Sequence, residues 1–225
     1  MQKSFKYYDI ILAVFAAVLL ISNLAGTKLI SFGPITTDGG AVLFPLAYIL
    51  GDVLTEIYGY KYARRAIWTA FGIMLLAVAA FTVVRYMPPA PEYTAQVSYE
   101  AVLGFFPRIV AASLTAFLTG SFLNSFVLAK LKVKTKGEKL WLRLIGSTFV
   151  GEFFDTVVFA LVAFGGILQG TGMLVYILIG WLFKTGVEVV CLPITYRVIA
   201  KMKQIENIDT YDNKTDFTPF RVDLD

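Results

Sequence analysis

The chain has 225 residues, of which 57% are hydrophobic and 16% are charged, and its mean hydropathy is +0.70. A soluble domain would carry about 45–50% apolar and about 25% charged residues, so this composition excludes an ordinary soluble protein and favours one that lies within a membrane. The formal net charge is +4, but the basic residues lie in short connections between apolar runs and form no single patch, which excludes nucleic-acid binding.

Six apolar runs along the chain are long enough to cross a membrane, because a helix needs ~20 residues to span a hydrocarbon core of about 30 Å. We therefore predict an all-α integral membrane protein with one transmembrane domain, residues 1–203. The first run follows Lys3 and Lys6 but is longer than the apolar core of a signal peptide, so we expect it to remain as the first helix. The predicted spans are 8–30, 40–59, 64–87, 108–129, 142–168 and 172–199.

Two segments lie outside these spans. Residues 86–107 form a predicted external loop, and its aromatic second half, 99–106, could be a short interfacial or re-entrant helix. Residues 204–225 are polar and acidic. We expect them to form a flexible cytoplasmic tail without a specific role.

The basic residues predict how the chain is oriented, because cytoplasmic loops carry an excess of lysine and arginine. Fourteen of them lie before the first span, between spans two and three, between spans four and five, or after span six, against three on the opposite side. Both termini are therefore expected in the cytoplasm, which requires an even number of spans and agrees with six. The expected location is the cell membrane, inner or plasma.

Ionisable side chains lie inside three of the predicted spans, where they are expensive and usually mark a pathway or a binding site. The sequence predicts a surplus of carboxylates around one deep cation, which suits a substrate that is cationic or that has several hydrogen-bond donors. The alternative is that these charges only pair with one another and hold the bundle together. The carboxylates are Asp52, Glu56, Glu152, Asp155 and Glu188, and the deep cation is Lys184.

The spacing of these residues favours one shared cavity. Asp52 and Glu56 are four residues apart, with Tyr48 one turn earlier, so all three lie on one face of a helix. Gly51-Asp52 in the second span is echoed by Gly151-Glu152 in the fifth. Such an echo is typical of 3+3 inverted repeats with the substrate at their interface, although glycines that only pack helices would give the same pattern.

Metal and cofactor chemistry is not predicted. The sequence has no histidine, the commonest metal ligand and general base, and its one cysteine, Cys191, has no second cysteine to pair with.

Three motifs stand out along the chain. They are ISNLAGTKLI at residues 21–30, PLAYILGDVLTEIYGY at 45–60 continuing to ARRAIW at 63–68, and GEFFDT at 151–156. Together they resemble motifs of the queuosine precursor transporter family, also called the vitamin-uptake transporter family, and Lys184 in the last span fits as well. The resemblance covers residues 8–203.

This resemblance implies a transporter, not an enzyme, that imports 7-deazaguanines such as preQ0 and preQ1 for queuosine salvage in tRNA modification. A deazaguanine presents several N–H donors along one edge, which carboxylates can accept, and the aminomethyl group of preQ1 adds a positive charge. Tyr48, Phe154 and Trp181 could stack on the flat ring. The expected substrate-binding residues are Asn23, Lys28, Tyr48, Asp52, Glu56, Glu152, Asp155, Trp181, Lys184 and Glu188.

Other functions remain open at this point. One is the substrate-binding subunit of an energy-coupling factor vitamin transporter, which would need partner ATPases; another is a cation channel or ion carrier. An intramembrane aspartyl protease is disfavoured, because the Tyr-Asp and Gly-x-Gly-Asp motifs are absent around Asp52 and Asp155. The sequence also leaves open the preferred precursor, coupling to protons or passive entry, and assembly into a homo-oligomer.

Overall fold

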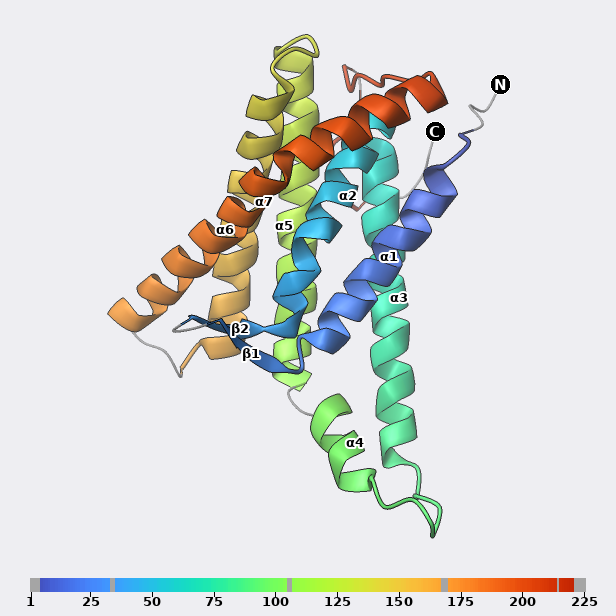
Figure 1. Ribbon diagram of the computed structural model, residues 1–225, viewed down its shortest axis with the longest axis vertical. Helices are drawn as coiled ribbons and strands as arrows, with labels where there is room; N and C mark the ends of the chain where they lie inside the picture. Colours follow the sequence, from blue (N-terminus) through green and yellow to red (C-terminus); the bar gives the residue numbers. More distant parts are fainter. Residues whose placement is uncertain (1–4, 33–34, 105–106, 167–169, 214, 221–225) are drawn as a thin grey trace.

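A computed structural model describes residues 5–32, 35–104, 107–166, 170–213 and 215–220 of the protein. The chain forms a bundle of helices (Figure 1), as the sequence predicts for an all-α membrane protein. A small antiparallel hairpin of β1 (Leu29–Phe32) and β2 (Ile35–Asp38), followed by a 3-10 turn (Gly39–Val42), joins the first two helices. The helices are α1 (Tyr8–Ala25), α2 (Phe44–Tyr58), α3 (Tyr60–Tyr86), α4 (Gln96–Leu103), α5 (Pro107–Lys134), α6 (Leu140–Phe164) and α7 (Thr171–Glu206).

Five of these helices are long and apolar enough to cross a membrane, namely α1, α3, α5, α6 and α7. The chain is therefore a multi-pass membrane protein. The helix in the predicted second span, α2, has 15 residues and reaches about 22 Å at about 1.5 Å per residue, short of a full crossing. Six complete crossings and an inverted repeat stay predictions.

The helix boundaries differ from the predicted spans at several points. The first helix ends at Ala25 because the chain turns there into the hairpin, and Gly39 N donates to Lys28 O at 2.8 Å to close its base. Gly59 separates α2 from α3 with a φ of +87°, which favours glycine over any residue with a side chain. The short helix predicted at 99–106 is α4, although residues 105–106 lie outside the described part, as do residues 167–168 of the fifth predicted span.

Two helices extend beyond their predicted spans at the same end of the bundle. The fourth predicted span ends at residue 129, whereas α5 continues to Lys134; the sixth ends at 199, whereas α7 continues to Glu206. The carboxylate of Glu206 accepts hydrogen bonds from the backbone N–H groups of Lys6 and Tyr7, at 3.0 and 2.7 Å. The segment before α1 therefore meets the end of α7, and we call this end of the bundle the terminal face.

The helix α2 lies inside the bundle, where it contacts α1, α3, α5 and α7 (Figure 1). Its apolar residues Val53, Leu54 and Ile57 are at most 1% exposed and belong to the same core as Phe15 and Phe117. Because α2 is enclosed, its polar residues are also buried, and they face neighbouring helices that carry polar groups of their own.

Candidate functional site

The close crossing of α5 and α6 positions one wall of the site. A Cβ atom added at Gly151 would lie 2.8 Å from Asn124 Cβ, and one added at Gly120 would lie 2.7 Å from Asp155 Cβ. Neither position has room for a side chain, so the two glycines let the helix backbones approach. This approach brings Asn124 of α5 and Asp155 of α6 next to the polar face of α2.

Asn124 binds Asp52 in the middle of the bundle. Its Nδ2 donates to Asp52 Oδ1 at 2.7 Å, and Asp52 and Asn124 are 0% and 2% exposed. The remaining oxygens, Asp52 Oδ2 and Asn124 Oδ1, are buried without a hydrogen-bond partner among the described residues. Asn124 is not among the binding residues expected from the sequence, where it is a single polar residue in an apolar span.

An ion-pair cluster joins α6 to α7 beside this pair. Lys184 Nζ lies 2.5 Å from Asp155 Oδ2 and 3.4 Å from Glu152 Oε2. Both carboxylates are almost fully buried, whereas the lysine side chain is 31% exposed. Three of the expected site residues therefore contact one another directly.

Two further expected residues complete this region. The Tyr48 hydroxyl lies close to Asp155, because a Cβ atom added at Gly120 would be 2.7 Å from both the hydroxyl oxygen and Asp155 Cβ. It also interacts electrostatically with Asp52, Glu152 and Glu188. Glu188 is 5% exposed and interacts electrostatically with Asp52 and Glu152. We call this region the central cluster: Tyr48, Asp52, Asn124, Glu152, Asp155, Lys184 and Glu188.

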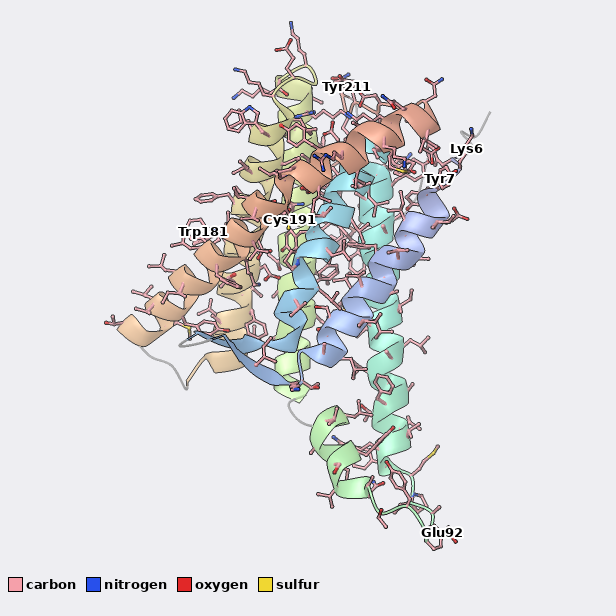
Figure 2. The ribbon with its side chains drawn as sticks, in the orientation of Figure 1. Lys6, Tyr7, Glu92, Trp181, Cys191 and Tyr211 are labelled. Carbon is pink, nitrogen blue, oxygen red and sulfur yellow. The ribbon has the colours of Figure 1, made fainter. Side chains whose placement is uncertain are left out.

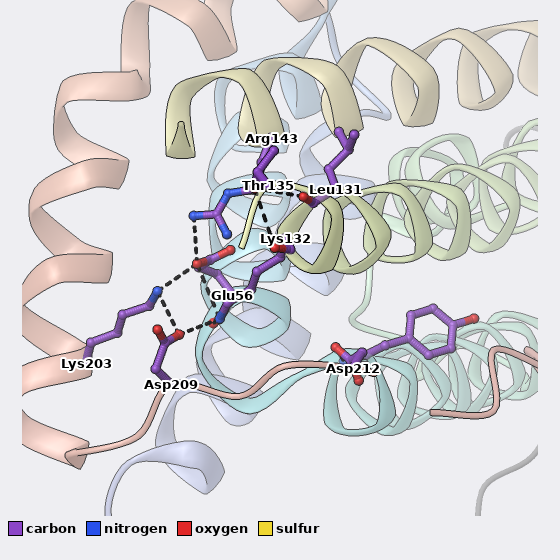
Figure 3. Close-up of polar contacts among 9 residues, drawn as sticks. Glu56, Leu131, Lys132, Thr135, Arg143, Lys203, Asp209 and Asp212 are labelled. Atoms are coloured by element: carbon purple, nitrogen blue, oxygen red, sulfur yellow. Dashed lines mark hydrogen bonds and ion pairs between the residues drawn. The ribbon is translucent and has the colours of Figure 1, made fainter. Parts of the chain in front are cut away.

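Glu56 lies in a different environment one turn further along α2. Its Oε1 atom lies 3.1 Å from Arg143 NH2, 2.7 Å from Lys203 Nζ and 3.4 Å from Lys132 Nζ. Figure 3 shows these side chains converging together with Asp209, which follows α7. We call Glu56, Lys132, Arg143, Lys203 and Asp209 the terminal cluster.

The terminal cluster corrects the expected balance of charges. Five carboxylates were expected to face one deep cation, but Glu56 pairs with three other cations, Lys132, Arg143 and Lys203. The expectation is wrong because Lys132 and Lys203 were placed in a loop and beyond the last span. They lie instead on the extended ends of α5 and α7, from which their side chains reach inward.

The remaining expected residues lie away from the central cluster. Asn23 Oδ1 accepts a hydrogen bond from Ser113 at 2.8 Å and so ties α1 to α5, while the side chain of Lys28 is exposed. Trp181 (Figure 2) donates to Phe149 O at 2.9 Å and packs on the rings of Phe149 and Phe153. Phe154, considered for stacking, is 41% exposed.

The described residues leave little open space in this conformation. A small cavity lies beside Tyr48, Asn124 and Ser125, and its room is that of about one water molecule. Another lies beside Glu188 and Thr148 and has no room for a water molecule. A purine-sized ligand would therefore require the helices to separate. No three carboxylate or thiol groups within the described ranges come together as a metal site.

Comparisons with known proteins agree on one family. Residues 38–198 match the family model described as "Putative vitamin uptake transporter". The chain is 33% identical over 187 residues to the "Probable queuosine precursor transporter" of Bacillus subtilis (strain 168), covering 83% of this chain and 80% of that protein. It is 29% identical over 128 residues to the "Queuosine precursor transporter" of Escherichia coli (strain K12), covering 57% and 55%. No solved structure matches it significantly.

Proposed function

The chain belongs to the vitamin uptake transporter family, and on that premise we propose that it is a membrane transporter that imports queuosine precursors. Membership in a transporter family, shared with two relatives named for queuosine precursors, supports transport over catalysis. The finer proposal is that its substrates are the 7-deazaguanine bases preQ0 and preQ1, salvaged for tRNA modification.

The observation that carries this proposal is the excess of buried hydrogen-bond acceptors in the central cluster. Asp52 Oδ2, Asn124 Oδ1 and Glu188 Oε2 are buried and lack hydrogen-bond partners among the described residues. A buried polar atom without a partner is unfavourable, so these atoms favour a ligand that supplies donors. A 7-deazaguanine does so, because its ring N–H and exocyclic amino groups lie along one edge.

The proposed roles follow from this geometry. Asp52 and Asn124 accept hydrogen bonds from the donor edge of the base, and the ring of Tyr48 lies against its face. Glu188 or the Glu152–Asp155 pair accepts the aminomethyl ammonium group of preQ1. The proposed binding set excludes Glu56, whose carboxylate is held by three cations of the protein. It also excludes Asn23 and Trp181, whose polar groups bind Ser113 and Phe149 O, and the exposed Lys28.

Charge balance leads to a proposal about energy coupling. The central cluster has four carboxylates and one lysine, and a buried net negative charge is strongly unfavourable. We propose that protons neutralise the surplus carboxylates when the site is empty and that the arriving substrate displaces them. Each entry of substrate is then exchanged for an exit of protons, and collapsing an inward proton gradient should accelerate the uptake of preQ0.

The proposed orientation places the terminal face in the cytoplasm of a cell that carries the protein in its cell membrane. The support is the gathering of basic residues at this end of the bundle, in keeping with the positive-inside rule. With both termini in the cytoplasm, α2 and the hairpin before it would together make the sixth crossing. Basic residues of this group are Lys61, Arg65, Lys130, Lys134, Lys136, Lys139, Arg197 and Lys201.

A rescue experiment tests the proposed function. A strain that cannot make preQ0 and lacks its own importer is supplied with a low concentration of preQ0 or preQ1, and queuosine in tRNA is measured. Queuosine is expected with the wild-type chain and with the exposed-loop control Glu92→Gln, but not with Asp52→Asn at equal protein levels. Equal queuosine without the chain would refute the proposal. Rescue only in hosts with energy-coupling ATPases would favour the binding-subunit alternative.

A further inference from the structure

We propose that the terminal cluster and the segment that follows α7 form a gate, which closes the substrate pathway at the terminal face. The segment consists of residues 207–213 and 215–220, and we call it the tail strap. The proposed gate opens when the ion pairs of Glu56 and Asp209 break and the tail strap separates from α2, α3 and α5. This inference rests on the proposed transport function, but its test below requires no substrate.

The first element of the gate is the carboxylate of Glu56, which holds four helices together. Arg143 of α6, Lys203 of α7 and Lys132 of α5 all approach its Oε1 atom, and Glu56 itself belongs to α2. Lys132 also donates a hydrogen bond to the backbone oxygen of Glu56. Because Glu56 is 0% exposed, any separation of these helices would leave buried charges unpaired, which is strongly unfavourable.

The second element is Asp209, which belongs to the tail strap and completes the cluster. Its Oδ1 atom lies 2.5 Å from Lys132 Nζ and 2.9 Å from Lys203 Nζ. Without Asp209, one carboxylate would face three cations, whose mutual repulsion would push α5, α6 and α7 apart. The tail strap thus supplies a charge on which the closed arrangement depends.

Asp209 is ionised at neutral pH. Burial alone would raise its pKa, but the hydrogen bonds from Lys132 and Lys203 outweigh burial and hold the pKa below its usual value. Protonation of Asp209 near neutral pH therefore cannot open the gate, and opening requires the strap to move.

Backbone hydrogen bonds anchor the tail strap to the junction of α2 and α3. Thr210 N donates to Ile57 O at 3.3 Å in the last turn of α2. Asp212 Oδ2 accepts a hydrogen bond from Tyr60 N at 3.1 Å, at the first residue of α3. A carboxylate at a helix N-terminus is favourable because it meets unsatisfied N–H groups and the positive end of the helix dipole.

Side chains of α3 hold the next part of the strap. Arg64 is 2% exposed, and its NH1 atom donates to Asp216 O at 2.9 Å and to Thr218 O at 2.6 Å. Trp68 Nε1 donates to Pro219 O at 2.7 Å. The buried Arg64 therefore uses its N–H donors to bind the backbone of the tail strap, which indicates that the strap is docked on α3 and not simply surrounded by water.

An aromatic contact fixes the strap between α3 and α5. The ring of Phe217 lies 4.9 Å from that of Tyr60 and 5.1 Å from that of Phe126. Lys130 Nζ lies 4.1 Å from the centre of the Phe217 ring, in a cation–π contact. The tail strap therefore differs from the flexible tail that we expected. Its acidic composition suggested a solvated segment, but its residues have specific partners on α3 and α5.

The position of this assembly makes it a gate and not only a clamp. Glu56 lies one helical turn beyond Asp52 on α2, so a substrate released from the central cluster toward the terminal face must pass it. The strap continues directly from α7, which also carries Lys184 and Glu188 of the central cluster. A single movement of α7 away from α2 would therefore have three effects at once. It would open the central cluster, break the Glu56–Lys203 ion pair and pull on the tail strap.

Cysteine accessibility tests the gate. In a Cys191→Ser background, Thr148→Cys places a reporter between Arg143 and Glu152 on α6, at a position that is 2% exposed. Inverted membrane vesicles are treated with a membrane-impermeant thiol reagent, without any precursor. Slow labelling is expected for the parent, and labelling about tenfold or more faster for Asp209→Asn, because the unbalanced cations separate.

Three further variants sharpen the result. Glu138→Gln removes an exposed carboxylate at the same end of the bundle and should label as slowly as the parent. Adding Lys203→Gln to Asp209→Asn restores the cluster's charge balance and should slow labelling again. Phe217→Ala loosens the strap without changing charge and should also accelerate labelling, which provides a second route if Asp209→Asn accumulates poorly.

Labelling that stays slow in both Asp209→Asn and Phe217→Ala would overturn the gate, as would equal acceleration by Glu138→Gln. Faster labelling in a chain that never restores queuosine would leave the gate standing and refute the proposed function. Normal queuosine rescue by the wild-type chain, together with labelling that the variants do not change, would refute the gate and leave the proposed transport function standing.

Discussion

Asp52 and Glu56 lie one turn apart on the same face of α2, yet their carboxylates have opposite surroundings. Asp52 meets an amide and retains an unpartnered oxygen, whereas Glu56 meets Lys132, Arg143 and Lys203. We infer that the first is available to a ligand and that the second is occupied by the protein itself. The two carboxylates should therefore respond differently when each is neutralised.

Neutralising Glu56 should destabilise the fold. Glu56→Gln would leave the buried Lys132 and Arg143 and the partly buried Lys203 without their shared carboxylate. Breaking a buried ion pair in this way typically costs about 3–5 kcal/mol. Thermal unfolding of the purified protein in detergent measures the effect, with Glu138→Gln as the matched surface control. A stable Glu56→Gln protein that has lost uptake would instead restore Glu56 to the substrate-binding set.

Removing the hydrogen bond to Asp52 should impair substrate binding. Asn124→Ala adds no atoms at the tight crossing of α5 and α6, and it cannot donate to Asp52 Oδ1 or accept from a substrate. We expect the KM for preQ0 uptake to rise about tenfold or more, which corresponds to roughly 1.4 kcal/mol. Protein level and unfolding temperature serve as controls, and an unchanged KM would remove Asn124 from the site.

Replacing Lys184 should abolish transport. Lys184→Gln would leave Asp155 and Glu152 without the cation that contacts both, while Lys184→Arg would keep the charge and part of the contact. At matched protein levels, we expect uptake to be fastest in the wild type, slower in Lys184→Arg and absent in Lys184→Gln. If the glutamine variant transports as well as the wild type, the α6–α7 ion pairs have no role in the cycle.

The crossing of α5 and α6 should tolerate no side chain at Gly151. In Gly151→Ala the new methyl group would lie 2.8 Å from Asn124 Cβ and 2.9 Å from Gly120 O, so overpacking should cost about 1–3 kcal/mol. Gly72→Ala is the matched control, because no atom lies within 4 Å of a Cβ there. The control should be neutral or stabilising by up to about 1 kcal/mol, since alanine favours helix. Equal stability of the two variants would contradict the packing described for α5 and α6.

The docking of the tail strap should be insensitive to pH in the physiological range. The pKa of Asp209 lies below its usual value of 3.8, so its contribution is fully present above about pH 4 and is lost as the pH falls through the lowered pKa. Hydrogen exchange of the strap, corrected for intrinsic rates, should be equal at about pH 5 and about pH 8. It should be faster at both values in Asp209→Asn. A strap that loosens between these two values in the wild type would point to a different titrating group.

Much of this architecture could be predicted because lipid imposes simple rules. Runs of about 20 apolar residues located the long helices, and four-residue spacing correctly placed Tyr48, Asp52 and Glu56 on one buried face. Hydropathy could not reveal that α5 and α7 continue beyond their apolar runs to Lys134 and Glu206, because the basic residues in these extensions are typical of loops. The separation of Glu56 from the central cluster follows from those extensions.

The tail was missed for a related reason. Its acidic composition is typical of a solvated segment, and composition averages over single contacts such as those of Asp212 with Tyr60 N and of Phe217 with Phe126. Asn124 was also left out of the site, since one polar residue in an apolar span does not show which helix it faces. The roles of the tail and of Asn124 depend on the residues that they contact, and these residues lie far away in the sequence.

The most direct test of the account is uptake of labelled preQ1 into proteoliposomes that contain only this protein. We predict saturable uptake that preQ0 competes for, that Asp52→Asn abolishes and that Glu92→Gln leaves unchanged. Absence of uptake by the correctly folded wild-type protein, or equal uptake by Asp52→Asn, would contradict the assignment of the central cluster as the transport site.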